Sequence, residues 1–188
     1  NLLVQAANTE LPSPALVQYI ASGLLNMNRP ELAQLCLNQL TETQLNHTSN
    51  AALVFEIATT TKDADRALHA ARILYNSNPD FPVFYSNLAS ALISAEKEPD
   101  LAIELAERTR KVMPPAPAFA INTAMAYLLK DDASTAKMIL EPYDSAQKGS
   151  LELDFWNYAW ARIHSIENNP DKARDFAAKV NLPSLYPG

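Results

Sequence analysis

Hydrophobic residues recur along the chain at helical spacing rather than strand spacing. Five similar short segments are each followed by apolar residues at intervals of three or four, as in Ala33, Cys36 and Leu37, which is the spacing of one helix face. A second amphipathic stretch precedes each segment, over roughly residues 14–27, 49–61, 82–97, 116–130 and 151–168. No segment alternates apolar and polar residues beside hairpin turn residues. The pattern predicts pairs of antiparallel helices joined by short turns, without strands.

The five short segments start the second helix of each pair and recur at an even interval. They are Arg29–Ala33, Asp63–Ala67, Glu98–Ala102, Asp132–Ala136 and Asn169–Ala173. Their closing alanines are separated by 34, 35, 34 and 37 residues. Pro at the first helical position costs no hydrogen bond, so we expect Pro30, Pro99 and Pro170 to open helices in the trans form. We also expect all five alanines to be buried where the two helices of a pair meet.

The period, the helix pair and the small residues together resemble the tetratricopeptide repeat, whose unit is about 34 residues long. The third unit matches with one inserted residue, through Tyr85, Leu88, Ala89 and Leu92 and then Ala102, Ala106 and Pro114. No unit has Gly at the glycine position of the family's first helix. The resemblance covers residues 14–181 and implies an all-α, right-handed α-solenoid of about five helix-turn-helix units. Residues 1–13 are then the tail of a preceding repeat helix with a linker, and residues 182–188 are a C-terminal tail.

Composition narrows the possible partners. Hydrophobic residues make up 48% of the chain and charged residues 19%, which suits a folded core. A net charge of -6 and a pI of about 5.0 weigh against nucleic-acid binding, which needs a basic face. A single cysteine excludes an internal disulfide and a multi-cysteine zinc site. No apolar run approaches the ~18 residues of a membrane span, so we expect no membrane insertion of this segment.

The residue types that carry chemistry are scattered. His47, His69 and His164 are not within a helical turn of one another or of Cys36, and no glycine-rich loop is present to hold a phosphate. We therefore expect no catalytic residues, no metal site and no cofactor, and we predict that the chain is not an enzyme. His164 is expected to be a packed, hydrogen-bonded histidine, and Cys36 a small core residue.

The resemblance also implies a binding surface. In stacked tetratricopeptide units the first helices line the concave face, where a partner segment lies. Family members that hold a peptide backbone often place Asn two residues after their Trp position, which corresponds here to Asn87 and Asn122. Ser90, Met125 and Arg162 lie one turn further along the same face. These five residues are the predicted partner-binding set, with the alternative that both Asn side chains are solvated or bonded within their helices.

Four aromatic residues crowd the first helix of the fifth pair. Phe155, Trp156, Tyr158 and Trp160 lie within six residues, so some of their rings must face outward. Packing in the core and at the end of the array accounts for most of them. A partner, or a following unit, would cover any ring that faces outward.

These observations favour a non-enzymatic module of a larger protein that binds a protein or peptide segment along its concave face. The alternative is a structural spacer within a bacterial envelope, secretion or polysaccharide-export protein. The segments 87–89 and 99–107 resemble repeats of bacterial envelope and polysaccharide-export proteins, which implies a periplasmic location. A helical-repeat RNA reader with units of 35 residues is the third reading, and the acidic pI weighs against it.

Overall fold

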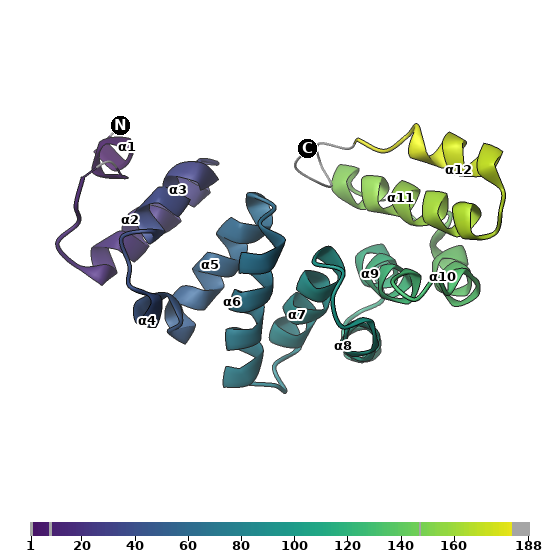
Figure 1. The fold of residues 1–188 in the computed structure, drawn as a ribbon, viewed down its shortest axis with the longest axis horizontal. Helices are drawn as coiled ribbons and strands as arrows, with labels where there is room; N and C mark the ends of the chain where they lie inside the picture. The colour runs from purple at the N-terminus through teal and green to yellow at the C-terminus, as the bar shows by residue number, and fades with distance from the viewer. Residues whose placement is uncertain (1, 8, 147, 182–188) are drawn as a thin grey trace. The chain divides into compact units, whose positions relative to one another are not determined.

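The computed structural model describes residues 2–7, 9–146 and 148–181, and all regular secondary structure within these ranges is helical (Figure 1). The α-helices are α1 (Leu2–Ala7), α2 (Pro14–Asn26), α3 (Pro30–Leu37), α4 (Glu42–Leu45), α5 (Thr48–Thr60), α6 (Ala64–Ser77), α7 (Pro82–Ser94), α8 (Pro99–Val112), α9 (Pro117–Leu128), α10 (Ala133–Leu140), α11 (Ser150–Ile166) and α12 (Pro170–Ala177). A short 3-10 helix, η1 (Glu141–Tyr143), follows α10. The predicted all-α class is confirmed, and helices that follow one another in the chain pack together.

The same turn ends the first helix of each predicted pair, namely α2, α5, α7, α9 and α11. The turn residues have positive φ angles: Asn28 (56°), Lys62 (60°), Glu96 (51°), Asp131 (55°) and Asn168 (56°). In every case the next residue donates its N–H to the carbonyl oxygen five residues back, as Asp63 does to Ala58 at 2.8 Å. This is the Schellman arrangement, which satisfies carbonyl groups left free at a helix end. The turn residues recur at the predicted interval, so the backbone carries the same period as the alanines.

The third of these turns contains the inserted residue. Ala102 lies six residues after the left-handed residue Glu96, whereas the other four alanines lie five residues after theirs. The extra residue leaves a second side chain in the left-handed region, Glu98 with φ 46°, directly before Pro99. The inserted residue is therefore accommodated within the turn.

Proline and short polar residues begin the second helices, as predicted. Helices α3, α8 and α12 start at Pro30, Pro99 and Pro170, and no peptide bond in the described ranges is cis. Where Pro is absent, an aspartate caps the helix instead. The Asp63 side chain accepts the N–H of Arg66 at the start of α6, which satisfies one of the free donors of the first turn.

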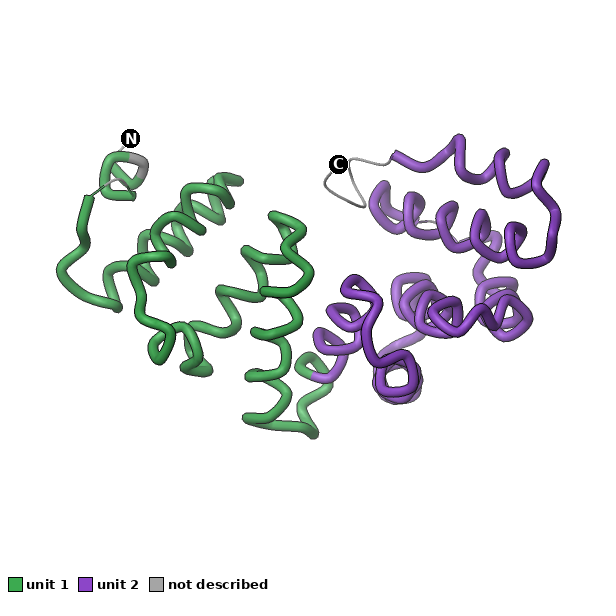
Figure 2. Tube along the Cα trace, viewed as in Figure 1, with its two compact units in different colours: residues 1–84 green, residues 85–188 purple. Residues whose placement is uncertain are grey.

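The first of two compact units comprises residues 1–84 (Figure 2). Its core forms around fully buried side chains that include Leu24, Leu37 and Ile57. Helix α1 packs on α2, and a Cβ atom at Gly23 would lie 3.0 Å from Leu3 Cδ1, so the glycine makes room for this contact. Helix α4 was not predicted from the sequence; a capping box between Thr41 and Gln44 stabilises it.

The second unit comprises residues 85–188 and contains α7 from Tyr85 onward. Helix α9 packs on α8, α10 and α11, and α12 packs on α11. Fully buried side chains in this core include Leu88, Leu105, Leu128 and Leu140. The predicted tail over residues 182–188 lies outside the described residues, and the assignment of residues 1–13 to a preceding repeat stays a prediction.

Four of the five period-setting alanines are buried as expected. Ala33, Ala102 and Ala136 have no exposed surface, and Ala67 is 5% exposed. The prediction is wrong for Ala173, which is half-buried. Helix α12 has no buried residue, because its main described neighbour is α11 alone. Its alanine is therefore covered on one side only.

Candidate functional site

The first helices of the second unit are tied side to side by polar contacts. Asn122 of α9 donates its Nδ2 hydrogen to Ser90 Oγ of α7 at 2.9 Å. Arg162 of α11 donates to the carbonyl oxygen of Leu128, at the end of α9, at 3.2 Å. Helices α7, α9 and α11 therefore present neighbouring surfaces within this unit. All five residues of the predicted partner-binding set come from these three helices.

Ser90 and Asn122 form a half-buried pair. Their hydrogen bond uses one donor of the Asn122 amide, and its Oδ1 accepts no hydrogen bond from the described residues. A side-chain amide offers two donors and two acceptor lone pairs. The remaining donor and the acceptor of Asn122 can therefore bind a further group, whereas one donor already bonds within the fold.

Asn87 lies one helical turn before Ser90 on α7. Its side chain is half-buried and makes no hydrogen bond within the part of the chain that the structure describes. Its amide donors and acceptor are therefore open to solvent or to a partner. Among the five predicted residues, Asn87 is the one whose polar atoms are least committed.

Met125 and Arg162 meet around a small cavity of about 10 Å³ that Ile93, Glu96 and Tyr158 also line. Met125 is 7% exposed, so its thioether lies beneath the surface. The Arg162 guanidinium also contacts Asp131 Oδ1 at 3.4 Å. Burial acts to lower the pKa of Arg162, but Tyr158 and the charge of Asp131 outweigh burial and the pKa is raised. Arg162 is therefore a fixed cation that holds α11 against the end of α9.

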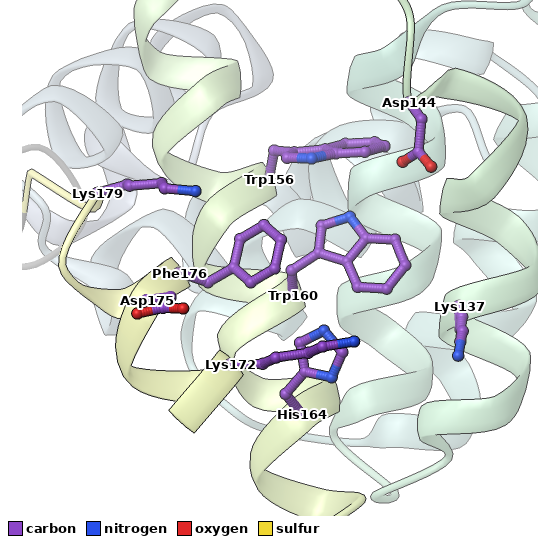
Figure 3. Close-up of a pocket in the computed structure, with 9 residues that line it drawn as sticks. All are labelled: Lys137, Asp144, Trp156, Trp160, His164, Lys172, Asp175, Phe176 and Lys179. Atoms are coloured by element: carbon purple, nitrogen blue, oxygen red, sulfur yellow. The ribbon is translucent and has the colours of Figure 1, made fainter. Parts of the chain in front are cut away.

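A second candidate site, which the sequence did not predict, lies in the second unit between α10, α11 and α12. It is a cavity of about 500 Å³, within the usual range of ligand sites. We refer to it as the aromatic–lysine cavity. Aromatic and charged side chains line it together, namely Lys137, Asp144, Trp156, Trp160, His164, Lys172, Asp175, Phe176 and Lys179 (Figure 3).

Stacked rings form the floor of this cavity. Trp156, Trp160 and His164 are four residues apart on α11, which places them on one helix face. Trp160 stacks on His164 with ring centroids 5.7 Å apart, and on Phe176 of α12 at 5.9 Å. His164 and Phe176 also stack, at 5.6 Å. The rings of Trp160, His164 and Phe176 join α11 to α12. Both tryptophans of the chain lie in the floor of this cavity.

Four lysines surround the aromatic floor. Lys148 Nζ lies 3.8 Å from the centroid of the Trp156 ring, and Lys179 Nζ lies 4.8 Å from that of Phe176. Lys137 of α10 contacts Glu167 at 3.6 Å, and Lys172 of α12 enters from the opposite wall (Figure 3). Cations over ring faces gain from the ring quadrupole. The cavity thus combines an apolar base with a charged rim in which the lysines outnumber the lining aspartates Asp144 and Asp175.

His164 is packed as predicted, but the hydrogen bond expected of it is absent at one nitrogen. Its Nδ1 lies 3.3 Å from Glu167 Oε2, but this buried nitrogen has no hydrogen-bond partner among the described residues. The other predicted structural roles fit. Cys36 is buried, and burial raises the pKa of its thiol, which makes it a poor nucleophile.

Groups that bind metals do not gather in the described chain. No three His, Cys, Asp or Glu side chains there come together in a way that could hold a metal ion. Nor does any helix within the described ranges combine the length and apolar character needed to cross a membrane. The crowded aromatic residues at 155–160 are the signal of this cavity in the sequence. The lysines come from three separate segments that only the fold brings together, so the cavity could not be predicted.

Comparison with known proteins returned no family assignment. No protein-family model matches the chain, and no curated protein matches it in sequence.

Proposed function

We propose that this chain is a tetratricopeptide-like module that binds a protein or peptide segment and has no enzymatic activity of its own. The observation that carries the proposal is the repeated turn. Left-handed residues at 28, 62, 96, 131 and 168 recur at the period that the resemblance requires. A right-handed solenoid of about five units is the architecture that such a series of helix pairs would build.

The proposed binding surface is the face shared by α7, α9 and α11, which we call the A-helix face. Asn87 and Asn122 occupy equivalent positions on neighbouring helices. An amide can donate to a backbone carbonyl and accept from a backbone N–H, so this pair suits an extended segment held through its main chain. Ser90 positions the Asn122 amide, Met125 forms part of the base, and Arg162 supplies a cation at one end.

Selection of peptides tests the proposal. A library of random linear peptides displayed on phage would be selected on the immobilised chain, and the selected peptides would be titrated calorimetrically. Asn122→Ala should weaken binding by ~1–2 kcal/mol, and Asn87→Ala should weaken it similarly. Asn76→Ala is the matched control, because Asn76 is exposed on the second helix α6. Selected peptides that bind all three variants as tightly as the unaltered chain would count against this surface.

A structural spacer is the second candidate function, and a specific observation favours it. Asn122 already bonds to Ser90, and Arg162 already holds Leu128 and Asp131, so much of the polar capacity of the A-helix face serves the fold. If the chain is a spacer, Asn122→Ala should lower the free energy of unfolding by about 1 kcal/mol. Peptide selection would then yield no ligand that depends on Asn87.

A further inference from the structure

The aromatic–lysine cavity gathers an unusual share of the chain's cations. Lys137, Lys148, Lys172 and Lys179 surround it or lie over its rings, and they are four of the eight lysines in a chain whose net charge is -6. Lys148 also donates to the carbonyl oxygen of Tyr143 at 2.7 Å, and Asp144 and Asp175 line the cavity beside the lysines. Three lining lysines, Lys137, Lys172 and Lys179, outnumber these two aspartates, so the cavity is complementary to an anion that also carries an apolar group.

We propose that the aromatic–lysine cavity binds an acidic peptide segment of a partner protein. Carboxylates of the segment would lie between Lys137 and Lys172, which approach from α10 and α12 (Figure 3). An apolar side chain of the segment would enter the space of about 500 Å³ beside Trp160 and Phe176. Flexible lysines act as point charges, so they accept carboxylates of a peptide without demanding one fixed geometry.

The state of the two tryptophans favours a peptide over a carbohydrate. A sugar that binds by stacking needs an open, flat ring face. Trp156 is covered by the Lys148 ammonium group, and Trp160 is stacked between its neighbours. The two indoles are 6% and 7% exposed, so they offer edges rather than platforms. Side chains that insert into a pocket with an apolar base suit this surface better.

The cavity is a site separate from the A-helix face. Its walls are the second helices α10 and α12, with Asp144 after η1 and the buried side of α11, and none of its lining residues belongs to the predicted partner-binding set. Weak ion pairs hold its rim: Lys137 and Glu167 are 3.6 Å apart, with both side chains more than a third exposed. Such pairs contribute little, so an incoming carboxylate can displace Glu167 readily.

Tryptophan fluorescence gives a direct test, because both tryptophans of the chain line the cavity. The probe is a pool of acetylated hexapeptide amides with Asp or Glu at four positions and Phe, Leu or Met at two. A second pool replaces the acids with Asn and Gln. Only the acidic pool should change the emission, in a way that weakens with added salt. Lys137→Gln combined with Lys172→Gln should reduce the affinity about tenfold.

Controls separate this site from others. Lys111→Gln changes an exposed lysine of the same unit outside the cavity and should leave the affinity unchanged, as should Asn122→Ala on the A-helix face. A response that is equal for both pools, or one that the double lysine variant leaves intact, would overturn the proposal. The proposal would also be overturned if neither pool changed the tryptophan emission, or if an oligogalacturonate changed it instead. None of these results bears on peptides selected for the A-helix face, so the two proposals fail separately.

Discussion

The helix pairs α9–α10 and α11–α12 share the same turn, but different side chains pack between their helices. In the former, Thr123 and Ala136 have no exposed surface, and Thr123 Oγ1 donates to the carbonyl oxygen of Ala106 in α8 at 3.5 Å. In the latter, the equivalent positions carry Trp160 and the half-buried Ala173. Aromatic rings thus replace small residues as the contact between helices. The backbone repeat is therefore independent of how the side chains of each pair pack.

The exchange extends to one further position, where Ile139 of α10 corresponds, 37 residues later, to Phe176 of α12. Tyr127 of α9 corresponds to His164, so a ring is present there in both pairs. His164 and Phe176 both stack with Trp160. A core of small and branched side chains interdigitates without voids. Flat rings stacked between helices leave space beside their edges, and the aromatic–lysine cavity lies there. Aromatic packing is one way in which a helix pair leaves space, since a cavity of about 440 Å³ beside α1 and α3 has no aromatic lining.

The largest effect is expected from removing the ring at the centre of the aromatic contact. Trp160 is 7% exposed and stacks on both His164 and Phe176. Trp160→Ala should lower the free energy of unfolding by about 3 kcal/mol, measured by urea denaturation with far-UV circular dichroism. Leu153→Ala, at a position 46% exposed on the same helix, should cost under ~1 kcal/mol. Equal costs would mean that α12 does not depend on the stacked rings.

Substitutions at two alanines test the difference between a buried and a half-buried helix contact. Ala102 has no exposed surface, so Ala102→Leu should overpack the contact of α8 with its neighbours and cost ~1–3 kcal/mol. Ala173 is half-buried, so Ala173→Leu should change stability by no more than ~0.5 kcal/mol. Both would be measured by denaturant unfolding. A neutral Ala102→Leu would contradict close approach as the reason for alanine at this position.

The sequence predicted the repeated features of the fold because they depend on local chemistry. Proline at a helix start and apolar residues at helical spacing act within a few residues, so the positions of α3, α8 and α12 followed from the pattern. The short helix α4 was missed because its four residues are too few to show a period. It depends instead on a side-chain cap between Thr41 and Gln44.

The sites were less predictable because they depend on neighbours that are distant in the sequence. The pattern places Met125 on the face of Asn122, but not beneath the Arg162 side chain, which comes from another helix. Likewise, the aromatic–lysine cavity combines Lys137 of α10, a helix of eight residues, with side chains of α11 and α12, whereas α8 runs for 14 residues. Helix length and the packing of separated segments are decided by the whole fold.

The smallest predicted effect concerns the turn that all these pairs share. Lys62 and Asn168 both occupy the left-handed position, with φ angles of 60° and 56°. Most side chains lose about 1–2 kcal/mol there, whereas Asn tolerates it, and glycine costs some entropy in return. Lys62→Gly should therefore raise the free energy of unfolding by about 0.5–1 kcal/mol, and Asn168→Gly by no more than a few tenths. Chemical denaturation of the two variants side by side measures the difference. An equal gain in stability at both positions would contradict this prediction. It would mean that the side chain at the turn, whether Asn, Asp, Lys or Glu, does not affect the strain of the left-handed conformation.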